Sequence, residues 1–521
     1  MTKKTSHPLI KSALLLTAAG LTTRVIGFFY KIFLVSFIGA EGIGIYQMVF
    51  PLYMLCVSLA SSGIQTAISR FTAERLSTVG PKRTRSLFLT GLFLALGLSL
   101  ATALPLYVLA EPIAVFYLGE IRCFPLLRVM ALAIPFETLH GCVSSYFIGQ
   151  KKTGFPALSQ FLEQLVRVAA TFFIYQFYIR EHLEPSPLMA AGGLLVAELS
   201  VALLSLTVLA LSRCHPAAEK SSRKNDETVR ADQKAVWHQN TRLIIGMALP
   251  ITGNRLMLNL LQSAEAAMIP TRLELYYKDA SAALSTYGIF NGMAMPLIML
   301  PCSITGSFSM VLLPSVSEAH ALHDDKKIAK TIRSSLTLCV FLGIISTWAF
   351  LCFGPSLGNL LYHEEQVGSY LTTLAWICPF LYLTTMMSSI LHGLGKTSSV
   401  FLHNLAGLGI RLFFTWAFVP AFGIRGCLWG LLASQLVTAL LGIRALSRTA
   451  SLSFSPFWAI LAPSALCLAS TALLRLVQRL LPILSAEGHW VSCLLSAGIW
   501  GCLVLLGAIP ALRVCSRTSQ N

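Results

Sequence analysis

The chain has 521 residues, of which 55% are hydrophobic and only 12% are charged, and its mean hydropathy is +0.70. An average soluble domain has about 25% charged residues, so this composition excludes a soluble enzyme or binding domain and predicts an integral membrane protein. The formal net charge of +17 is expected from basic cytoplasmic loops and their contact with anionic lipids. Nucleic acid is therefore not expected among the partners.

Long apolar segments recur along the whole chain. A helix that crosses a bilayer needs about 20 mostly apolar residues, and about 14 segments of that kind can be counted. They are too long for barrel strands and lack the alternation that a barrel requires, so they predict an all-α integral membrane protein. Their approximate centres are Ile26, Val57, Leu96, Leu139, Ala169, Leu199, Leu256, Met299, Phe341, Leu381, Leu412, Leu432, Leu468 and Ser496.

Lysine and arginine are concentrated in alternate loops between these segments. If the N-terminus is inside, roughly 26 basic residues lie in inside segments and about 7 in outside segments, as the positive-inside rule expects. One span more or fewer would reverse every later loop and destroy this pattern. The sequence therefore predicts cytoplasmic N and C termini in a multi-pass protein of the cell (cytoplasmic) membrane.

The second half of the chain repeats the first at an offset of about 244 residues, the spacing between Pro135 and Pro379. The longest match pairs Pro135, Phe136, Leu139, Ser144, Ser145, Gly149, Lys152, Thr153, Leu158 and Arg167 with Pro379, Phe380, Leu383, Ser388, Ser389, Gly393, Lys396, Thr397, Leu402 and Arg411. A fixed-period repeat of this kind is typical of two-lobed membrane transporters.

The repeat predicts two pseudo-symmetric lobes of six helices each, followed by two extra C-terminal helices. The first lobe is expected in residues 1–212 and the second in 243–450, and a cytoplasmic linker of mixed charge at 213–242 joins them. Residues 451–521 hold the last two spans and a cytoplasmic tail.

Four basic residues within the apolar segments are candidates for substrate binding. A charge inside the membrane is costly, so it is expected to face a water-filled cavity or a partner. Arg24 and Lys31 are two helical turns apart and share one face of the first span, and Arg255 has the comparable place in the seventh. Arg411 is the second-lobe arginine of the repeat. Because guanidinium groups bind phosphate oxygens with two parallel hydrogen bonds, these residues indicate an anionic, phosphate-bearing substrate.

The remaining charged and amide candidates have two open interpretations. These residues are Glu137, Glu163, Arg167, Glu198, Asn254 and Glu265. Glu163 precedes Arg167 by one helical turn, which allows a local ion pair with a purely structural role. The other glutamates either pair with arginines or carry a coupling proton or cation. Oxygen ligands for Na⁺ are available from Asn254, Asn259 and Glu265.

No motif for a cofactor, a metal ion or ATP is found. The 13 cysteines are scattered, without a C-x-x-C pair, and behave as small apolar residues. Gly395, Lys396 and Thr397 resemble the end of a phosphate-binding loop, but the glycine required five positions before Gly395 is Ile390. We therefore expect no cofactor, no metal and no enzymatic activity, and an ion or substrate gradient as the energy source.

The region of the first two spans resembles polysaccharide-flippase-type exporters of the multidrug, oligosaccharidyl-lipid and polysaccharide (MOP) superfamily. It is similar to the branches of that superfamily associated with sporulation and with lipid II flipping. The residues that carry the resemblance are Lys11 to Gly20, Arg24, Lys31, Gly39, Glu41, Gly42, Gly44, Tyr46, Gln47, Pro51, Ser69, Arg70 and Glu74.

This resemblance implies two lobes that rock about a central cavity in alternating access. It implies that the two spans after the repeat form a groove for a polyprenyl tail, and that Arg24 and Arg255 face the substrate pyrophosphate. Arg70 falls at the end of the second span, so the head-group contacts are expected to differ from those of lipid II flippases.

The expected function is a flippase for an undecaprenyl-pyrophosphate-linked sugar or peptidoglycan precursor, acting in spore cortex or cell-envelope polysaccharide assembly. The expected partners are that polyprenyl-linked glycan, membrane lipids, a coupling Na⁺ or H⁺, and cell-wall or spore-envelope synthesis proteins. The alternative within the superfamily is a multidrug or cation antiporter. A membrane-embedded glycosyl polymerase is disfavoured because the external segments are short and carry one close acidic pair, Glu364 and Glu365.

Overall fold

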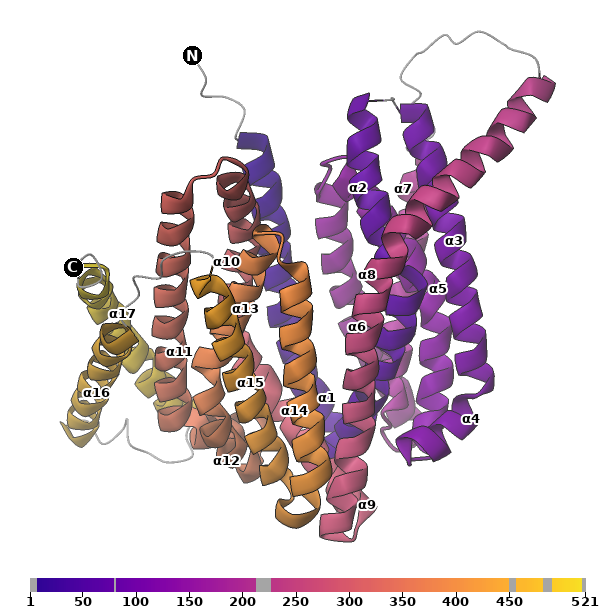
Figure 1. Ribbon diagram of the computed structural model, residues 1–521. Helices are drawn as coiled ribbons and strands as arrows, with labels where there is room; N and C mark the ends of the chain where they lie inside the picture. The colour runs from indigo at the N-terminus through magenta and orange to yellow at the C-terminus, as the bar shows by residue number, and fades with distance from the viewer. Residues whose placement is uncertain (1–6, 79–80, 212–225, 449–455, 481–489, 518–521) are drawn as a thin grey trace. The chain divides into compact units, whose positions relative to one another are not determined.

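The computed structural model describes residues 7–78, 81–211, 226–448, 456–480 and 490–517 (Figure 1). This part of the chain is helical throughout its regular structure and contains no strand, which confirms the all-α prediction. Helices run through both halves of the sequence and are joined by short connections. Residues 213–225 of the predicted linker lie outside the described residues, and from Asp226 onward the chain is helical.

The helices are long in both halves of the chain. Those before residue 278 are α1 (His7–Val57), the π-helical η1 (Ser58–Ser62), α2 (Gly63–Thr78), α3 (Pro81–Val108), α4 (Ala110–Pro112), η2 (Ile113–Leu118), α5 (Cys123–Gly149), α6 (Gly154–Arg180), α7 (Leu188–Leu211) and α8 (Asp226–Tyr277). Those after it are α9 (Ala280–Tyr287), η3 (Gly288–Ala294), α10 (Met295–Ala321), α11 (Asp325–Tyr362), α12 (Glu365–Leu374), η4 (Ala375–Ile377), α13 (Cys378–Gly393), α14 (Thr397–Phe422), α15 (Ile424–Ser447), α16 (Pro456–Leu480) and α17 (Trp490–Arg517).

Twelve helical stretches among the described residues are long and apolar enough to cross a membrane. One of them, Ala18–Leu76, has 59 residues, about 88 Å at 1.5 Å per residue, whereas a bilayer core is about 30 Å thick. The backbone leaves helical geometry at Gly39 (φ 68°, ψ −177°), which divides this stretch into two spans. A further apolar segment, Leu495–Gly507, lies in α17. The division at Gly39 and the segment in α17 each add one span to the twelve stretches, which gives the 14 spans that the sequence predicts.

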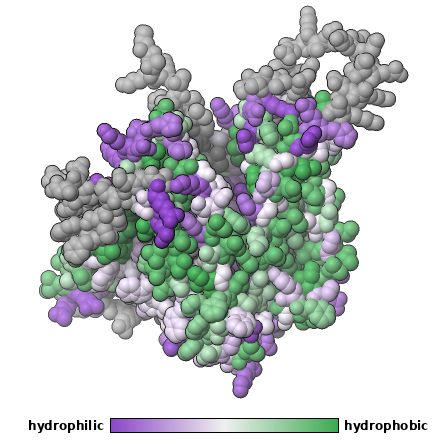
Figure 2. Space-filling model, viewed as in Figure 1, coloured by the Kyte–Doolittle hydropathy of each residue, from purple (hydrophilic) through white to green (hydrophobic). Residues whose placement is uncertain are grey.

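Large apolar side chains cover the outside of these helices. Phe116, Phe173 and Leu506 are all more than two-thirds exposed. Figure 2 shows hydrophobic side chains along the flanks of the helices and hydrophilic ones near the helix ends. In water such surfaces would be unstable, so they are the surfaces that face lipid.

The structure divides into two compact units. The first contains residues 1–30 and 37–268, and the second contains 31–36 and 269–521. The division falls within α8 because the early part of this helix packs on the first unit. Ile244 and Ala248 lie in one buried cluster with Ile68 of α2 and Leu87 of α3. The sequence repeat predicts lobe boundaries at 212 and 243, and these boundaries stay a prediction.

The backbone carries the same repeat as the sequence. Left-handed residues end corresponding helices in the two halves: Gly119 (φ 74°) corresponds to His363 (φ 54°), and Lys151 (φ 61°) corresponds to Gly395 (φ 74°). The members of each pair are about 244 positions apart, the offset of the sequence repeat. The two halves therefore turn at matching positions, although the residue at the turn differs between the two copies in both pairs.

Two glycines of the repeat also make matching close approaches. A Cβ atom at Gly149 would lie 2.6 Å from the Ser69 carbonyl oxygen, and a Cβ atom at Gly393 would lie 3.0 Å from the Leu313 carbonyl oxygen. In each half, glycine lets the fourth span approach the backbone of the second. This contact explains why glycine recurs at both positions.

Replacing Gly149 with alanine is expected to destabilise the first unit by about 1–3 kcal/mol, the usual cost of overpacking a core. The obstacle is the backbone at Ser69, which cannot rotate away as a side chain can. Thermal melting of the purified protein in detergent measures this loss. Gly154→Ala is the matched control, because a Cβ there meets nothing within 4 Å. Equal melting of the two variants would contradict the packing argument.

Candidate functional site

A buried ion-pair cluster lies within the first compact unit, on α6 and α7. The Nη2 atom of Arg167 donates to the Glu163 carboxylate on α6 and to Glu198 Oε1 on α7, the latter at 3.4 Å. The side chains of Arg167 and Glu163 are less than one-fifth exposed, and that of Glu198 is 3% exposed. The i to i+4 spacing on α6 supplies the first pair. The packing of α7 against α6 supplies the second.

A third carboxyl group reaches this cluster from α5. Glu137 interacts electrostatically with Glu198 and with Glu163. The cluster therefore contains three carboxyl groups, Glu137, Glu163 and Glu198, and one guanidinium group, Arg167. Among the described residues, Glu198 Oε2 and Arg167 Nε have no hydrogen-bond partner.

Small residues bring the helices of this cluster together. A Cβ atom at Gly193 of α7 would collide with Thr171 Oγ1 and would lie 3.1 Å from the Arg167 carbonyl oxygen. Glycine therefore allows α7 to approach α6 closely, which brings Glu198 to Arg167. Thr171 donates to the same carbonyl at 2.9 Å and bonds to the Tyr30 hydroxyl at 3.0 Å, which joins α1 to this part of the unit.

Two tyrosines of α1 also face the cluster and were missed in the sequence. Tyr46 interacts electrostatically with Arg167 and Glu198, and Tyr53 does so with Glu198 and Glu137. Both side chains are buried, and among the described residues the Tyr53 hydroxyl has no hydrogen-bond partner. Their spacing of seven residues places them on one helix face. This spacing is the sequence feature by which the two tyrosines could have been identified.

The acidic part of the cluster belongs to the first half of the repeat alone. The positions about 244 residues after Glu137, Glu163 and Glu198 hold Leu381, Gly407 and Gly442, whereas Arg167 has its counterpart in Arg411. The repeat therefore keeps the arginine in both halves, with carboxyl groups at these helix positions only in the first.

The basic substrate-binding candidates lie on three helices. Arg24 of α1 and Arg255 of α8 belong to the first compact unit and are exposed. Lys31 of α1 and Arg411 of α14 are assigned to the second unit and are half-buried. Their convergence on one substrate head group stays a prediction.

The two candidate oxygen ligands on α8 cannot bind one ion together. Asn254 is exposed, whereas Glu265 is 6% exposed. Both lie in the single helix α8, and the 11 residues between them correspond to about 16 Å along the axis. A role for either residue in cation binding stays a prediction. Among the described residues, no group of three or more His, Cys, Asp or Glu side chains is arranged to hold a metal ion.

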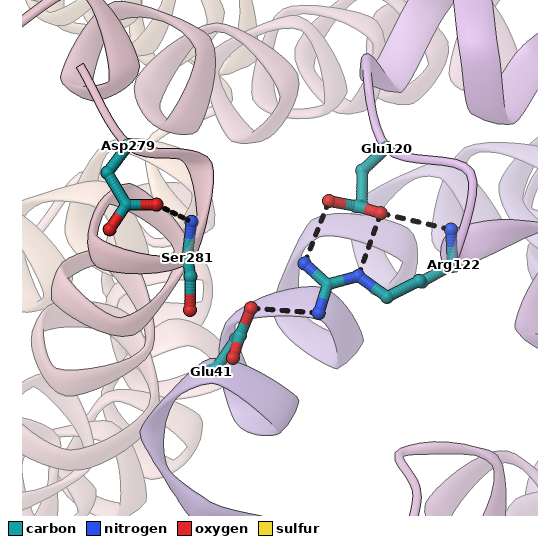
Figure 3. A network of polar contacts seen from close by, with 5 residues as sticks. All are labelled: Glu41, Glu120, Arg122, Asp279 and Ser281. Carbon is teal, nitrogen blue, oxygen red and sulfur yellow. Dashed lines mark hydrogen bonds and ion pairs between the residues drawn. The ribbon is translucent and has the colours of Figure 1, made fainter.

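A second polar network, which sequence reasoning did not find, lies at the turn after Gly39 (Figure 3). Arg122, which directly precedes α5, donates to Glu120 from Nε at 2.9 Å and from Nη2 at 3.0 Å, and to Glu41 from Nη1 at 2.8 Å. The network links the corner between the first two spans to the connection before α5. Figure 3 also shows Asp279, whose side chain accepts a hydrogen bond from the Ser281 amide and caps α9.

This network predicts a loss of stability in acid. Hydrogen bonds from Arg122 hold the pKa of Glu120 below its usual range. A lowered carboxyl pKa in the folded state contributes stability above the unfolded-state pKa, and this stability is lost as the pH falls through the folded-state pKa. The melting temperature in detergent is therefore expected to fall below about pH 4.5, and less steeply in a Glu120→Gln variant. Identical acid profiles for the two proteins would contradict this role.

The fold defines a two-lobed, all-helical membrane transporter. The chain belongs to the polysaccharide biosynthesis protein family, whose model matches residues 9–320. The model of the MatE family matches residues 260–417. The chain is therefore a multi-pass protein of the cell membrane and a MOP-superfamily transporter, as the sequence resemblance predicted.

Curated relatives match most of the chain. Stage V sporulation protein B of Bacillus subtilis is 26% identical over 448 residues, which are 85% of this chain and 84% of that protein. Lipid II flippase MurJ of the same organism is 22% identical over 473 residues, 86% of this chain and 84% of MurJ.

Solved structures show the same fold at low sequence identity. An inward closed conformation of the lipid II flippase MurJ has a TM-score of 0.69 at 14% identity and covers 96% of this chain and 99% of its own. An inward-facing multidrug resistance MATE family transporter has a TM-score of 0.62 at 15% identity, covering 84% of this chain and 100% of its own.

Proposed function

We propose that this protein is a flippase that moves an undecaprenyl-pyrophosphate-linked sugar or peptidoglycan precursor across the cytoplasmic membrane by alternating access. The observation that carries the proposal is the likeness to the MurJ fold over 96% of the chain. The multidrug transporter structure covers 84%, so the MurJ architecture accounts for more of this protein. Similarity to stage V sporulation protein B supports a setting in spore cortex or envelope assembly, with synthesis proteins of that envelope as partners.

The basic candidates suit such a substrate. Arg24, Lys31, Arg255 and Arg411 are cations within apolar helices, where a charge is costly unless it has a function or a partner. A pyrophosphate group offers the oxygen pairs that a guanidinium fork binds. We propose that these four residues bind the head group as the lobes alternate.

The helices α16 and α17 are the proposed contact for the lipid tail. They pack against α11 through a buried cluster of Phe353, Cys467, Leu474, Trp500 and Val504. The Trp500 indole donates to the Thr471 hydroxyl at 3.1 Å, which satisfies its polar atom inside the helix pair. The outer surfaces remain apolar, with Leu468 and Leu505 exposed, and such surfaces suit a polyprenyl chain.

The second candidate function is a multidrug or cation antiporter, supported by the MatE family match to residues 260–417. One experiment distinguishes the two. Proteoliposomes that contain the purified protein receive fluorescent lipid II in one leaflet, and its exposure in the other is followed over time. The same vesicles are tested for gradient-driven movement of a cationic dye. Lipid II movement without dye movement supports the flippase, and the reverse result contradicts it.

A further inference from the structure

We propose that Arg128 binds the phosphate group of one anionic phospholipid on the exposed side of α3 and α5. The guanidinium carbon of Arg128 lies 4.3 Å from the ring centre of Phe124 on the same helix. It lies 5.2 Å from the ring centre of Tyr107 on α3. Rings from two helices therefore hold this cation in place. They attract its positive charge but offer no oxygen atom to its five N–H donors.

No protein carboxylate neutralises this arginine among the described residues. None of the ion pairs there includes Arg128. The acidic side chain nearest to it in sequence is Glu120, which accepts from Arg122 with both carboxylate oxygens. Arg128 is exposed, yet it belongs to a helix that is apolar enough to cross the membrane. A cation in such a helix is costly without a partner, so an acceptor from outside the protein is expected.

The packing of α3 and α5 places Arg128 at the level of the lipid head groups. The two helices lie side by side (Figure 1). Near the end of α5, Tyr146 stacks on Phe88 of α3, with 4.4 Å between the ring centres. The 18 residues from Arg128 to Tyr146 correspond to about 27 Å along the helix, close to the thickness of a bilayer core of about 30 Å. Arg128 therefore lies near the opposite membrane surface, which the distribution of basic residues predicts to be external.

Exposed apolar side chains continue from Arg128 toward the middle of the membrane. On α5, Leu132 follows Arg128 by one helical turn, and on α3, Leu104 and Leu100 precede Tyr107 by about one and two turns. All three leucines are exposed. Their spacing places them on the same helix faces as Arg128 and Tyr107. A cation at the head-group level above an apolar surface matches the phosphate group and the acyl chain of one lipid molecule.

An anionic phospholipid fits this site better than a zwitterionic one. Its phosphodiester supplies the oxygen pair that a guanidinium fork binds. The ammonium group of a zwitterionic lipid would need a carboxylate, and Arg122 already holds both oxygens of Glu120. A free phosphate ion would use the cation but not the apolar surface. The site includes none of the four basic residues proposed to bind the transported head group, so it does not rest on the proposed function.

Native mass spectrometry of the purified full-length protein in detergent tests the proposal. Phosphatidylglycerol is added in steps, and the dissociation constant of the first bound molecule is measured. We expect Arg128→Gln to weaken this binding by about 10-fold or more, the effect of losing a charge-assisted hydrogen bond. Arg180→Gln is the matched control, because it removes an exposed arginine at the end of α6. This control should bind the lipid as the wild type does.

Two further variants test how the arginine is held. Arg128→Lys keeps the charge but loses the planar two-pronged geometry, so intermediate binding is expected. Tyr107→Leu removes one ring beside the guanidinium group and should weaken binding by about 3-fold. Phosphatidylglycerol should also raise the melting temperature of the wild type more than that of Arg128→Gln, because a ligand of the folded state stabilises it.

Equal binding of phosphatidylglycerol by the wild type and Arg128→Gln would overturn the proposal. An equal loss in Arg180→Gln would also overturn it, because net charge alone would then explain the effect. Phosphatidylcholine that binds as tightly as phosphatidylglycerol would contradict the anionic head group, and displacement of the lipid by inorganic phosphate would indicate a site for a free anion. Displacement by a lower concentration of lipid II would assign the site to the transported substrate instead. Melting without added lipid checks that each variant is folded, and if Arg128→Gln is not, Arg128→Lys and Tyr107→Leu carry the test.

Discussion

An Arg24→Ala, Arg255→Ala double variant is expected to lose lipid II movement by at least about 100-fold, measured as the initial rate of leaflet exposure in proteoliposomes. A charge-assisted hydrogen bond contributes about 1.5–3 kcal/mol, so two lost guanidinium groups remove about 3–6 kcal/mol of head-group binding. Both side chains are exposed on membrane helices, so alanine leaves no cavity in the core. The effect is therefore expected on transport rather than on folding.

Matched substitutions separate the possible causes of that loss. Arg180→Ala removes an exposed arginine at the end of α6 and is expected to transport at the wild-type rate. Arg24→Lys keeps the charge but loses the two-pronged geometry, so an intermediate rate is expected. Wild-type movement by the double variant would contradict the assignment of these two residues to the substrate.

Arg167→Met is expected to destabilise the protein by about 3–5 kcal/mol, the usual result of removing one partner from a buried ion pair. The variant would leave Glu137, Glu163 and Glu198 without the cation that faces them. Thermal melting in detergent measures the loss, and Arg180→Met is the control for removal of an arginine from the same helix.

Neutralising the carboxyl groups should restore stability. In an Arg167→Met, Glu163→Gln, Glu198→Gln variant no charge is stranded at the former ion pairs, and replacing all partners of a buried pair is often close to neutral. A single Arg167→Met variant that melts at the wild-type temperature would show that the cluster does not depend on this guanidinium group. A triple variant no more stable than the single one would show that stranded charge is not the cause.

The two halves of this transporter share a backbone plan but differ in chemistry. Arg167 and Arg411 are equivalent in the repeat, yet the carboxyl groups around Arg167 correspond to Leu381, Gly407 and Gly442 in the second half. A duplicated scaffold thus carries a buried acidic cluster in one copy. The first copy therefore has carboxyl groups that balance its repeat arginine, whereas the second copy has apolar or glycine residues at those positions.

Several features of the protein follow from local sequence. Lengths of apolar sequence determined the spans, since only helices satisfy the backbone within lipid, and a constant offset revealed the duplication. The Glu163 and Arg167 pair was also predictable, because residues four apart on a helix are neighbours. The resemblance carried by the first two spans led to the correct family.

Other features were decided only by tertiary structure. Glu137 and Glu198 lie on helices that are separated from each other in sequence by α6, and nothing local indicates that they meet. Gly193 decides how closely α7 approaches α6. The bonds from Arg122 to Glu41 likewise depend on the turn at Gly39. Periodicity reports which face of a helix is apolar, whereas the partner of a buried charge depends on how several helices pack.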